Sequence, residues 1–342
     1  MTKDNHEYAE FVALHNTVLN IYKSFKELCE AHGLRYFAIS GTTLGAVLWK
    51  GFIPWDDDMD IAMPVEDYGK FVSLKNELPS ELAFSEYLWF GGKLHDKRTT
   101  FTNIHYAIDT GRYNGVFIDI VPLIALPDDK EDRDSFIKEL KAFQKSGLIW
   151  DRYGELYGVS SKKELFAWQK RLLKSYKFGE TSFIMDFSDP RYVLSAKGFL
   201  DPVPAVFEDT VIPLSSNAKN DLSIQYGRYK KYPPVEKRTS LHQMLGILDL
   251  NKPFSYYAES FDMLPDWCKS LFRAKHTGEC LYLKNIYNQE KYIASLETEN
   301  KLLRDESSRL SLKIELINSS KPYRLGVALL RPFSAIKKLF SS

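Results

Sequence analysis

The chain has 342 residues and a mass of 39.6 kDa; 44% of the residues are hydrophobic, 27% charged and 14% aromatic. These proportions exclude a disordered or collagen-like chain and are sufficient for one large domain or two smaller ones. The 46 Lys and Arg nearly balance the 45 Asp and Glu, and a net charge of +1 gives no overall basic field for nucleic acid. We therefore expect no nucleic-acid partner.

The cysteines and the hydropathy pattern indicate a cytoplasmic protein. Three cysteines without Cys-x-x-Cys spacing fit a reducing compartment, and they suit neither a disulfide framework nor a zinc ribbon. Residues 1–11 are polar where a secretory signal has an apolar stretch. The longest apolar stretches, near 116–126 and 325–330, are interrupted or short, so we expect no membrane-spanning helix.

The first part of the chain predicts alternating helices and strands. Apolar residues three and four positions apart between Phe11 and Cys29 predict an amphipathic helix that covers a sheet and stops at Gly33. The elements expected next are a strand at 35–40, a turn at Gly41, a helix at 42–50, a strand at 59–63, a helix with Glu66 in its first turn, and strands at 83–90, 99–108 and 116–121 separated by turns at 91–92, 95–97 and 111–115.

The rest of the main domain predicts a helical extension. From 131 to about 178, apolar residues such as Phe136, Leu140 and Phe143 recur at helical spacing, and a region rich in Pro and Tyr follows. This order predicts an α+β domain over residues 1–280, in which helices flank a mixed sheet.

Residues 283–318 predict a coiled coil. Two interleaved series recur every seven positions with charged residues between them: Ile286, Ile293, Asn300, Ser307, Ile314 and Leu296, Leu303, Leu310, Ile317. Asn300 at an a-type position favours a parallel homodimer, which we expect here. The alternative is an amphipathic helix that lies on its own domain.

The segment 51–63 (GFIPWDDDMDIAM) places four carboxylates within five positions at the start of a predicted strand. Because alternate residues of a strand face the same side, we expect Asp58 and Asp60 to point together. Neighbouring carboxylates suit Mg²⁺ or Mn²⁺, which bind proteins together with substrate phosphates. The alternative is a solvated acidic loop or helix cap.

Asp119 lies in the apolar run VFIDIVP, where a lone charge is costly unless it binds a metal or pairs with a Lys or Arg. If this strand lies beside 59–63, Asp58, Asp60 and Asp119 form one cluster. The turn Ser40-Gly41-Thr42, 16 residues before Asp58, offers backbone N–H groups and hydroxyls to a phosphate. Together these features predict a nucleotidyltransferase-like fold and a site for phosphoryl transfer.

The same motifs resemble those of a known family. The run SGTTLGAVLWKGFIPWDDDMDIAMPVEDYGKF, with the segments 93–99 (KLHDKRT), 115–123 (GVFIDIVPL) and 207–238, resembles the LicD family, relatives of fukutin and fukutin-related protein. The resemblance covers about residues 7–240. It implies transfer of phosphocholine or a similar phospho-alcohol from a CDP-activated donor to a glycan.

The resemblance also implies roles for single residues. It implies Asp58 and Asp60 as metal ligands, Asp56 or Asp57 as an auxiliary ligand or structural acid, and Asp119 as third ligand or base. Lys93 is expected to approach the donor phosphates, unless it is a surface lysine.

The sequence departs from the family after the predicted helix at 42–50. The family commonly has Arg-His there, whereas this chain has Leu48-Trp49, so Trp49 is a candidate to stack on a base or a cation of the donor. If the donor carries choline, further candidates for an aromatic cage are Trp55, Trp89, Tyr106 and Tyr113.

Residues 319–342 form a basic amphipathic tail. Five of the Lys and Arg and no acid lie in 316–342, whereas residues 1–315 carry a net charge of −4. Apolar residues beside Lys and Arg suit the headgroup boundary of an anionic membrane, and a helix packed on the domain is the alternative. Since lipid-linked glycans are assembled on the cytoplasmic leaflet, we expect peripheral attachment to the inner face of the cell membrane.

Three functions fit these observations. The first is a Mg²⁺-dependent phosphotransferase that moves a phospho-alcohol from CDP to a hydroxyl of a cell-surface glycan, or of its lipid-linked precursor, and releases CMP. The second is a nucleotidyltransferase that releases pyrophosphate. The third is a non-catalytic membrane-associated scaffold that acts through the coiled coil.

Overall fold

The computed structural model describes residues 3–88, 91–102, 115–153, 162–234, 238, 247–256 and isolated positions between 303 and 315. The chain divides into two compact units, Met1–Arg273 and Ala274–Ser342. Among the described residues, no helix combines the length and the apolar character needed to cross a bilayer.

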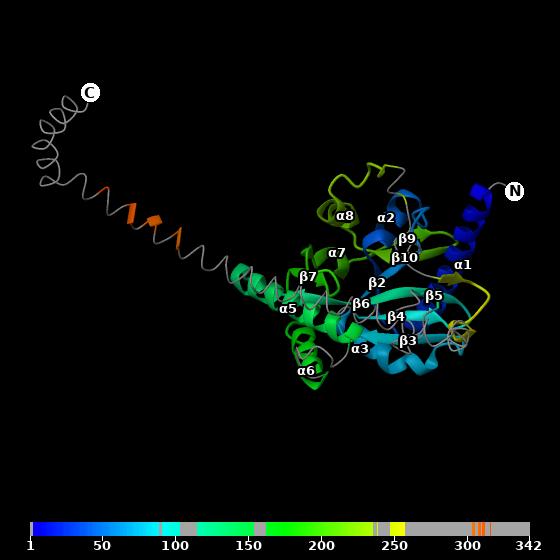
Figure 1. Cartoon of the computed structure of the whole chain (residues 1–342), viewed down its shortest axis with the longest axis horizontal. Helices are drawn as coiled ribbons and strands as arrows, with labels where there is room; N and C mark the ends of the chain where they lie inside the picture. The colour runs from blue at the N-terminus through cyan, green and yellow to red at the C-terminus, as the bar shows by residue number, and fades with distance from the viewer. Residues whose placement is uncertain are drawn as a thin grey trace, which may run out of the picture. The chain divides into compact units, whose positions relative to one another are not determined.

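A mixed sheet of seven strands forms the centre of the first unit (Figure 1). Five strands follow the order β1-β2-β6-β4-β3, while β7 pairs with the second half of β6 and β8 pairs with β7. Only β2 and β6 are parallel within this sheet. The strands are β1 (Phe37–Ala38), β2 (Asp60–Pro64), β3 (Leu82–Tyr87), β4 (Gly91–Asp96), β6 (Phe117–Leu126), β7 (Phe183–Asp186) and β8 (Leu194–Ser195).

Helices and two separate two-stranded antiparallel sheets accompany this sheet. The paired strands are β9 (Val203–Phe207) with β10 (Thr210–Leu214), and β5 (Thr100–Thr102) with β11 (Ile247–Asp249). The helices are α1 (Lys3–Ala31), α2 (Ser40–Leu48), α3 (Val65–Leu74), α5 (Lys130–Tyr153), α6 (Lys162–Leu173), α7 (Lys197–Leu200) and α8 (Ala218–Tyr226), with one 3-10 turn at Lys75–Glu77. The expected mixed sheet with flanking helices is confirmed.

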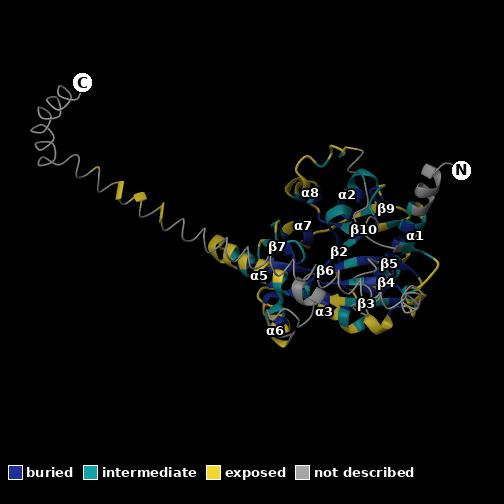
Figure 2. Ribbon diagram, viewed as in Figure 1, coloured by how far each residue is buried: buried dark blue, intermediate teal, exposed yellow. Residues whose placement is uncertain are grey.

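The two faces of the sheet carry different apolar clusters, because successive residues of a strand point to opposite sides. Ile61 of β2 and Ile120 of β6 join α1 and α3 in the largest cluster. Ala62 and Val121, one position later in each strand, face the other side and pack with Phe199 of α7. Figure 2 shows the strands mostly as buried ribbon, with exposed residues on the outer faces of the helices.

Several expected helices are confirmed. α1 contains the amphipathic pattern that begins at Phe11, and its buried face carries Val18, Tyr22 and Phe25. α5 and α6 occupy most of the expected helical extension, and they pack on β6 and β7 through residues such as Phe143. The apolar faces that the sequence predicts for these helices are therefore the faces that pack in the core.

The expected turn at Gly41 is wrong. The strand ends at Ala38, and α2 begins at Ser40, so Gly41 lies in the first helical turn. The chain makes this change within two residues, because Ile39 is extended and Ser40 has a φ of 47°. The Thr43 hydroxyl donates a hydrogen bond to the Ala38 carbonyl (2.8 Å), which ties the new helix to the end of the strand.

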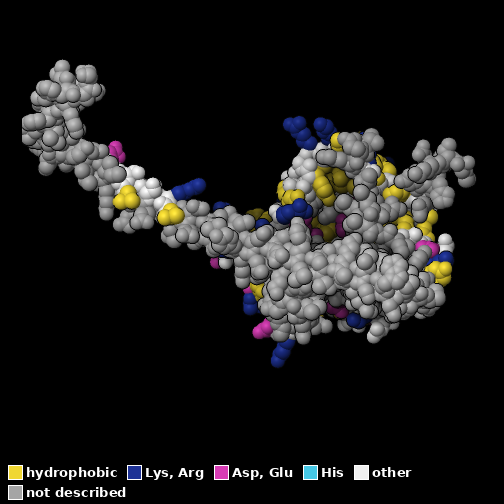
Figure 3. All heavy atoms as spheres, viewed as in Figure 1, with side chains coloured by type: hydrophobic (Ala, Val, Ile, Leu, Met, Phe, Trp, Pro, Cys, Tyr) yellow, Lys and Arg dark blue, Asp and Glu magenta, His cyan; other side chains and the backbone are white. Residues whose placement is uncertain are grey.

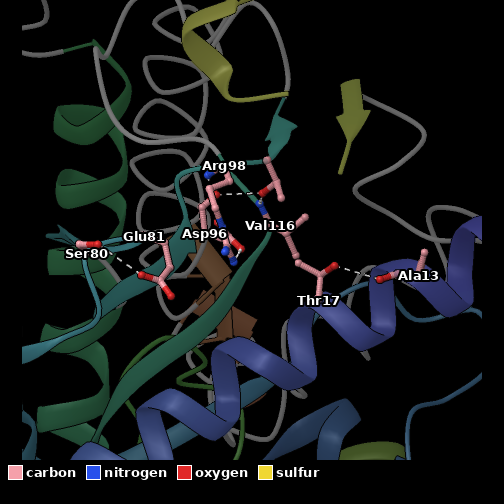
Figure 4. A network of polar contacts seen from close by, with 8 residues as sticks. Ala13, Thr17, Ser80, Glu81, Asp96, Arg98 and Val116 are labelled. Carbon is pink, nitrogen blue, oxygen red and sulfur yellow. Dashed lines mark hydrogen bonds and ion pairs between the residues drawn. The ribbon is translucent and has the colours of Figure 1, made fainter. Parts of the chain in front are cut away.

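The expected turns at 91–92 and 95–97 are also partly wrong, since Gly91–Asp96 forms β4 between β3 and β6. A Cβ at position 92 would lie 2.2 Å from Cζ of Phe84 and 2.8 Å from the Ser85 carbonyl oxygen on the neighbouring strand, so a larger residue here would force that ring or strand to shift. The chain turns only after Asp96, which pairs with Arg98 (2.6 Å). The Thr99 hydroxyl accepts the Val116 N–H and donates to the Asp96 carbonyl, which joins this turn to the start of β6 (Figure 4).

The second unit is described only at isolated positions. Those positions are helical, and Leu303 and Leu310 are 55% and 52% exposed. Figure 3 shows hydrophobic side chains as yellow spheres at described positions of this segment. The coiled coil remains a prediction because most of its heptad positions, with the basic tail at 319–342, lie outside the described residues.

Candidate metal centre

Two neighbouring parallel strands bring the predicted acids together. In the register of β2 and β6, Asp60 lies opposite Asp119, and both side chains share the face of Ala62 and Val121. Asp58 precedes β2 by two residues. One carboxylate oxygen from each of Asp58, Asp60 and Asp119 lies within 4.8 Å of the others, so the structure assembles the predicted cluster.

A second acidic group adjoins the first. Asp56, Asp57 and Asp58 also have carboxylate oxygens within 4.8 Å of one another, and Asp58 belongs to both groups. The Asp56 N–H donates to the Ile53 carbonyl (2.9 Å), which closes a turn of the acidic loop. Asp57 is only 2% exposed, which fits a structural acid, whereas Asp56 and Asp58 are half-buried.

The cluster concentrates negative charge. Burial, followed by the charges of Asp58, Asp119 and Asp56, raises the pKa of Asp60 well above its usual value. Carboxylates in such an arrangement are stabilised by a cation, and oxygen ligands are those that Mg²⁺ and Mn²⁺ prefer. The carboxylate oxygens of this cluster thus fit the expected Mg²⁺ or Mn²⁺.

The N-terminal turn of α2 borders the acids. The Asp60 N–H donates to the Thr42 hydroxyl (2.7 Å), so Thr42 links α2 to β2. A Cβ on Gly41 would lie 2.8 Å from Oδ2 of Asp56, so a side chain here would displace that carboxylate. Ser40 and Gly41 lie in the first turn of the helix, where backbone N–H groups have no helical acceptor. Phosphate binding by these three residues remains a prediction.

Lys93 lies in the cluster and is not a surface lysine. Its Nζ is 2.6 Å from Oδ1 of Asp119, and the two side chains are 20% and 16% exposed. Lys93 lies opposite Asp119 in the register of β4 and β6, and its Nζ lies 3.4 Å from the ring centroid of Phe117. Asp119 therefore belongs to an ion pair and also to the acidic cluster. The two alternatives given for this residue, a Lys or Arg partner and a place in a metal site, are thus compatible.

The structure adds residues that sequence reasoning missed. Nε2 of His15 on α1 donates to the Asp56 carbonyl (2.7 Å), and its ring stacks on Phe52 with centroids 4.3 Å apart. Asp186 ends β7, and burial raises its pKa to about 6. The pKa of Tyr226 on α8 is raised by partial burial and then by the charges of the acids, Asp60 first.

Only Asp186 carried a signal in the sequence. It is a single acid in the apolar run FIMDF, the pattern that identified Asp119. His15 on α1 and Tyr226 on α8 lie far from the acidic loop in the sequence, one before it and one after it. Nothing in the residues around them indicates a place in the site.

Two of the aromatic candidates meet beside the acidic loop. Trp49 caps the C-terminal end of α2, and its ring contacts Trp55 with centroids 5.7 Å apart. Trp49 also contacts Tyr232, at 5.3 Å between centroids. The other candidates, Trp89, Tyr106 and Tyr113, lie outside the described residues.

Comparison with known proteins gives the family. Residues 33–148 match the family model described as LicD/FKTN/FKRP, nucleotidyltransferase domain. The lipopolysaccharide cholinephosphotransferase LicD of Haemophilus influenzae is 34% identical over 250 residues, which cover 66% of this chain and 92% of that protein. Uncharacterized proteins of Rickettsia prowazekii and Rickettsia typhi are each 44% identical over 52 residues, 14% of this chain and 20% and 17% of theirs. With the acidic motif, its neighbouring strand and nearly the full length of the Haemophilus protein matched, this chain belongs to the LicD family.

Proposed function

We propose that the protein is a metal-dependent phosphotransferase that moves phosphocholine, or a similar phospho-alcohol, from a CDP-activated donor to a hydroxyl of a cell-surface glycan or its lipid-linked precursor. The cluster of Asp58, Asp60 and Asp119 beside the N-terminus of α2 is the observation that carries this proposal. The Haemophilus relative, named a lipopolysaccharide cholinephosphotransferase, supports phosphocholine as the group and a glycan as the acceptor.

The acids hold the ion and Lys93 faces the phosphates. Asp58, Asp60 and Asp119 bind Mg²⁺ or Mn²⁺, with Asp56 as an auxiliary ligand. When bound, the ion neutralises charge on the diphosphate of the donor. Lys93 approaches the same phosphates, and the 2.6 Å contact of its Nζ with Asp119 supports this role. Ser40, Gly41 and Thr42 present the N-terminal turn of α2 to a phosphate.

The proposed step is a displacement at phosphorus. The acceptor hydroxyl oxygen forms a bond to the phosphorus that carries the alcohol, and the bond from this phosphorus to the oxygen of CMP breaks. The hydroxyl proton passes to Asp119 or to water, and CMP leaves with the electron pair. The closeness of Asp119 to both the ion-binding acids and Lys93 supports its place at the attacking hydroxyl.

The products separate this proposal from its two alternatives. With CDP-choline, CDP-ribitol and CDP-glycerol and a membrane glycolipid extract, the phosphotransferase releases CMP from one donor in Mg²⁺. A nucleotidyltransferase instead releases pyrophosphate from a nucleoside triphosphate. Release of neither product by the wild type, with normal biological function of the Asp60→Asn variant, would favour the scaffold.

The location and assembly are part of the same proposal. The basic tail at 319–342 docks the protein on the inner face of the cell membrane, and the coiled coil at 283–318 makes it a homodimer. Each of the five cations in the tail contributes about 1 kcal/mol near an anionic surface. Flotation with anionic liposomes should carry the full chain and not residues 1–318; equal flotation of both contradicts the tail's role.

A further inference from the structure

Three aromatic rings and one guanidinium gather at the C-terminal end of α2. The rings of Trp49 and Trp55 are nearly perpendicular, at 84°, and those of Trp49 and Tyr232 are tilted by 31°. Cζ of Arg238 lies 5.3 Å from the ring centroid of Trp55 and 5.7 Å from that of Tyr232. Both distances are within the range of a cation–π interaction.

The arrangement shows that these rings accept a cation. The Nε–H of Arg238 donates to the Pro233 carbonyl (2.9 Å), which holds the guanidinium beside Tyr232. Tyr232 is 52% exposed, and Trp49 and Trp55 are half-buried, so the rings can be reached from solvent. A cation that enters from solvent therefore competes with an arginine of the same chain.

The ring directions favour a rounded cation over a flat base. A nucleobase stacks on parallel faces, whereas the faces of Trp49 and Trp55 are almost at right angles. A trimethylammonium group presents a similar apolar and positive surface in every direction, and it can contact faces of different orientation.

The cluster lies next to the metal centre along the chain. Trp55 directly precedes Asp56, so their Cα atoms are about 3.8 Å apart. Gly51, near the start of the same loop, packs on α2, since a Cβ on Gly45 would lie 2.4 Å from the Gly51 carbonyl oxygen. The loop therefore carries an aromatic wall and a proposed metal ligand as consecutive residues.

We infer that Trp49, Trp55 and Tyr232 form the recognition site for the quaternary ammonium head group of the donor, with the Arg238 guanidinium as an internal cation that the head group displaces. The inference rests on the proposed function for the identity of the cation, and it narrows the phospho-alcohol to one that carries a quaternary amine. It assigns Trp49, at the C-terminal end of α2, to the head group.

The test is binding of choline alone to the full-length protein, without nucleotide or metal, by calorimetry and tryptophan fluorescence. We expect choline to bind more tightly than its neutral isostere 3,3-dimethylbutan-1-ol. Trp55→Leu and Tyr232→Leu should each weaken choline binding about 3- to 10-fold, because each removes one ring face. Arg238→Gln should strengthen choline binding, since it removes the competing cation.

Tyr256→Leu is the matched control. Tyr256 is an exposed tyrosine whose ring centroid lies 4.2 Å from Nζ of Lys252, so this variant removes a cation–aromatic contact elsewhere. Choline binding should not change in Tyr256→Leu. Three results would overturn the inference: equal affinity for choline and the neutral isostere, no choline binding by either the wild type or Arg238→Gln, or an unchanged choline affinity in both Trp55→Leu and Tyr232→Leu.

Turnover separates this inference from the proposed function. CMP release from CDP-choline is measured in Mg²⁺ for the same variants. Choline binding without CMP release contradicts the proposed function and leaves the head-group site supported. CMP release with an unchanged KM for CDP-choline in Trp55→Leu overturns the head-group site and leaves the phosphotransferase supported.

Discussion

Asp60 and Asp119 lie directly opposite each other in the parallel register of β2 and β6. Neighbouring strands are about 4.8 Å apart, so two carboxylates on one face of the sheet repel each other. Asp58 adds a third negative charge, and the raised pKa of Asp60, caused by burial and by these neighbours, reflects that crowding. The arrangement is costly for the protein alone and favourable once a cation binds.

The substitution Asp60→Asn should abolish tight Mn²⁺ binding. Loss of groups that only support metal ligands costs about 10- to 100-fold in metal affinity, so loss of a direct ligand should cost about 100-fold or more. Titration with Mn²⁺, followed by electron paramagnetic resonance, measures the affinity. Mn²⁺ affinity within 3-fold of the wild type would exclude Asp60 as a ligand.

The same substitution should stabilise the protein in EDTA. Each unit by which the fold raises the pKa of Asp60 corresponds to about 1.4 kcal/mol of unfavourable free energy of the charged form, which a neutral amide removes. Denaturant unfolding in EDTA should therefore give a higher midpoint for Asp60→Asn than for the wild type. Asp209→Asn, which neutralises an exposed carboxylate, should leave the midpoint nearly unchanged.

Replacement of Lys93 by Met should destabilise the metal-free protein. Removal of one partner of a buried ion pair costs about 3–5 kcal/mol, and the partial exposure of Lys93 and Asp119 reduces our expectation to about 2 kcal/mol. Mg²⁺ should recover more stability in Lys93→Met than in the wild type, because it neutralises the carboxylate that has lost its partner. Thermal unfolding in Mg²⁺ and in EDTA provides the comparison.

Two variants calibrate that result. Lys75→Met breaks the exposed pair with Glu86 (3.3 Å) and should cost less than about 1 kcal/mol with no response to Mg²⁺. Lys93→Arg keeps the charge and should retain most of the stability. An equal gain from Mg²⁺ in Lys93→Met and in the wild type would contradict a metal at Asp119.

His15→Ala should weaken Mn²⁺ binding about 10-fold, because it removes the hydrogen bond to the Asp56 carbonyl that holds the acidic loop. His15→Gln can donate to the same carbonyl and should restore most of the affinity. Thr17→Ala, on the same helix, removes only a local bond to the Ala13 carbonyl and is the control (Figure 4). If His15→Ala loses stability but keeps the wild-type Mn²⁺ affinity, His15 does not position the loop.

Asp186 should make stability fall as the pH rises from about 4 to about 6. Its pKa is 3.8 in the unfolded chain and about 6 in the fold, where burial raises it against the hydrogen bonds from Ser188. Between these values the folded protein holds a proton that the unfolded chain has lost, so unfolding becomes easier, by up to about 3 kcal/mol above pH 6. Asp186→Asn should remove this part of the decline and leave the part that the raised pKa of Asp60 causes. Denaturant unfolding at pH 4, 5, 6 and 7 measures it, and an unchanged slope contradicts the raised pKa.

The sequence predicted the acidic cluster but not the residues from other segments that contact it. The D-x-D spacing of Asp58 and Asp60, with Asp119 in a second strand, follows from the alternation of side chains along a strand and required only that the strands be neighbours. The long helices were also predictable, since their apolar faces repeat at helical spacing over many residues.

The remaining features depend on packing between distant segments. β4 (GGKLHD) lacks the alternating hydrophobic residues that would predict a strand, and the ring of Phe84 occupies the space where a side chain of residue 92 would lie. Without the strand, the sequence could not predict that Lys93 is the partner of Asp119. The contact of His15 with Asp56 joins residues 41 positions apart. Arg238 reaches Trp55 from still farther along the chain, and no local pattern encodes such a meeting.

The most direct test of the account is the transfer of labelled phosphocholine from CDP-choline to a membrane glycolipid acceptor by the wild type and by Asp60→Asn, each in Mg²⁺ and in EDTA. We predict that label reaches the acceptor, with an equal amount of CMP released, only for the wild type in Mg²⁺. Transfer that continues in EDTA, or in Asp60→Asn at the wild-type rate, would contradict a metal held by Asp58, Asp60 and Asp119.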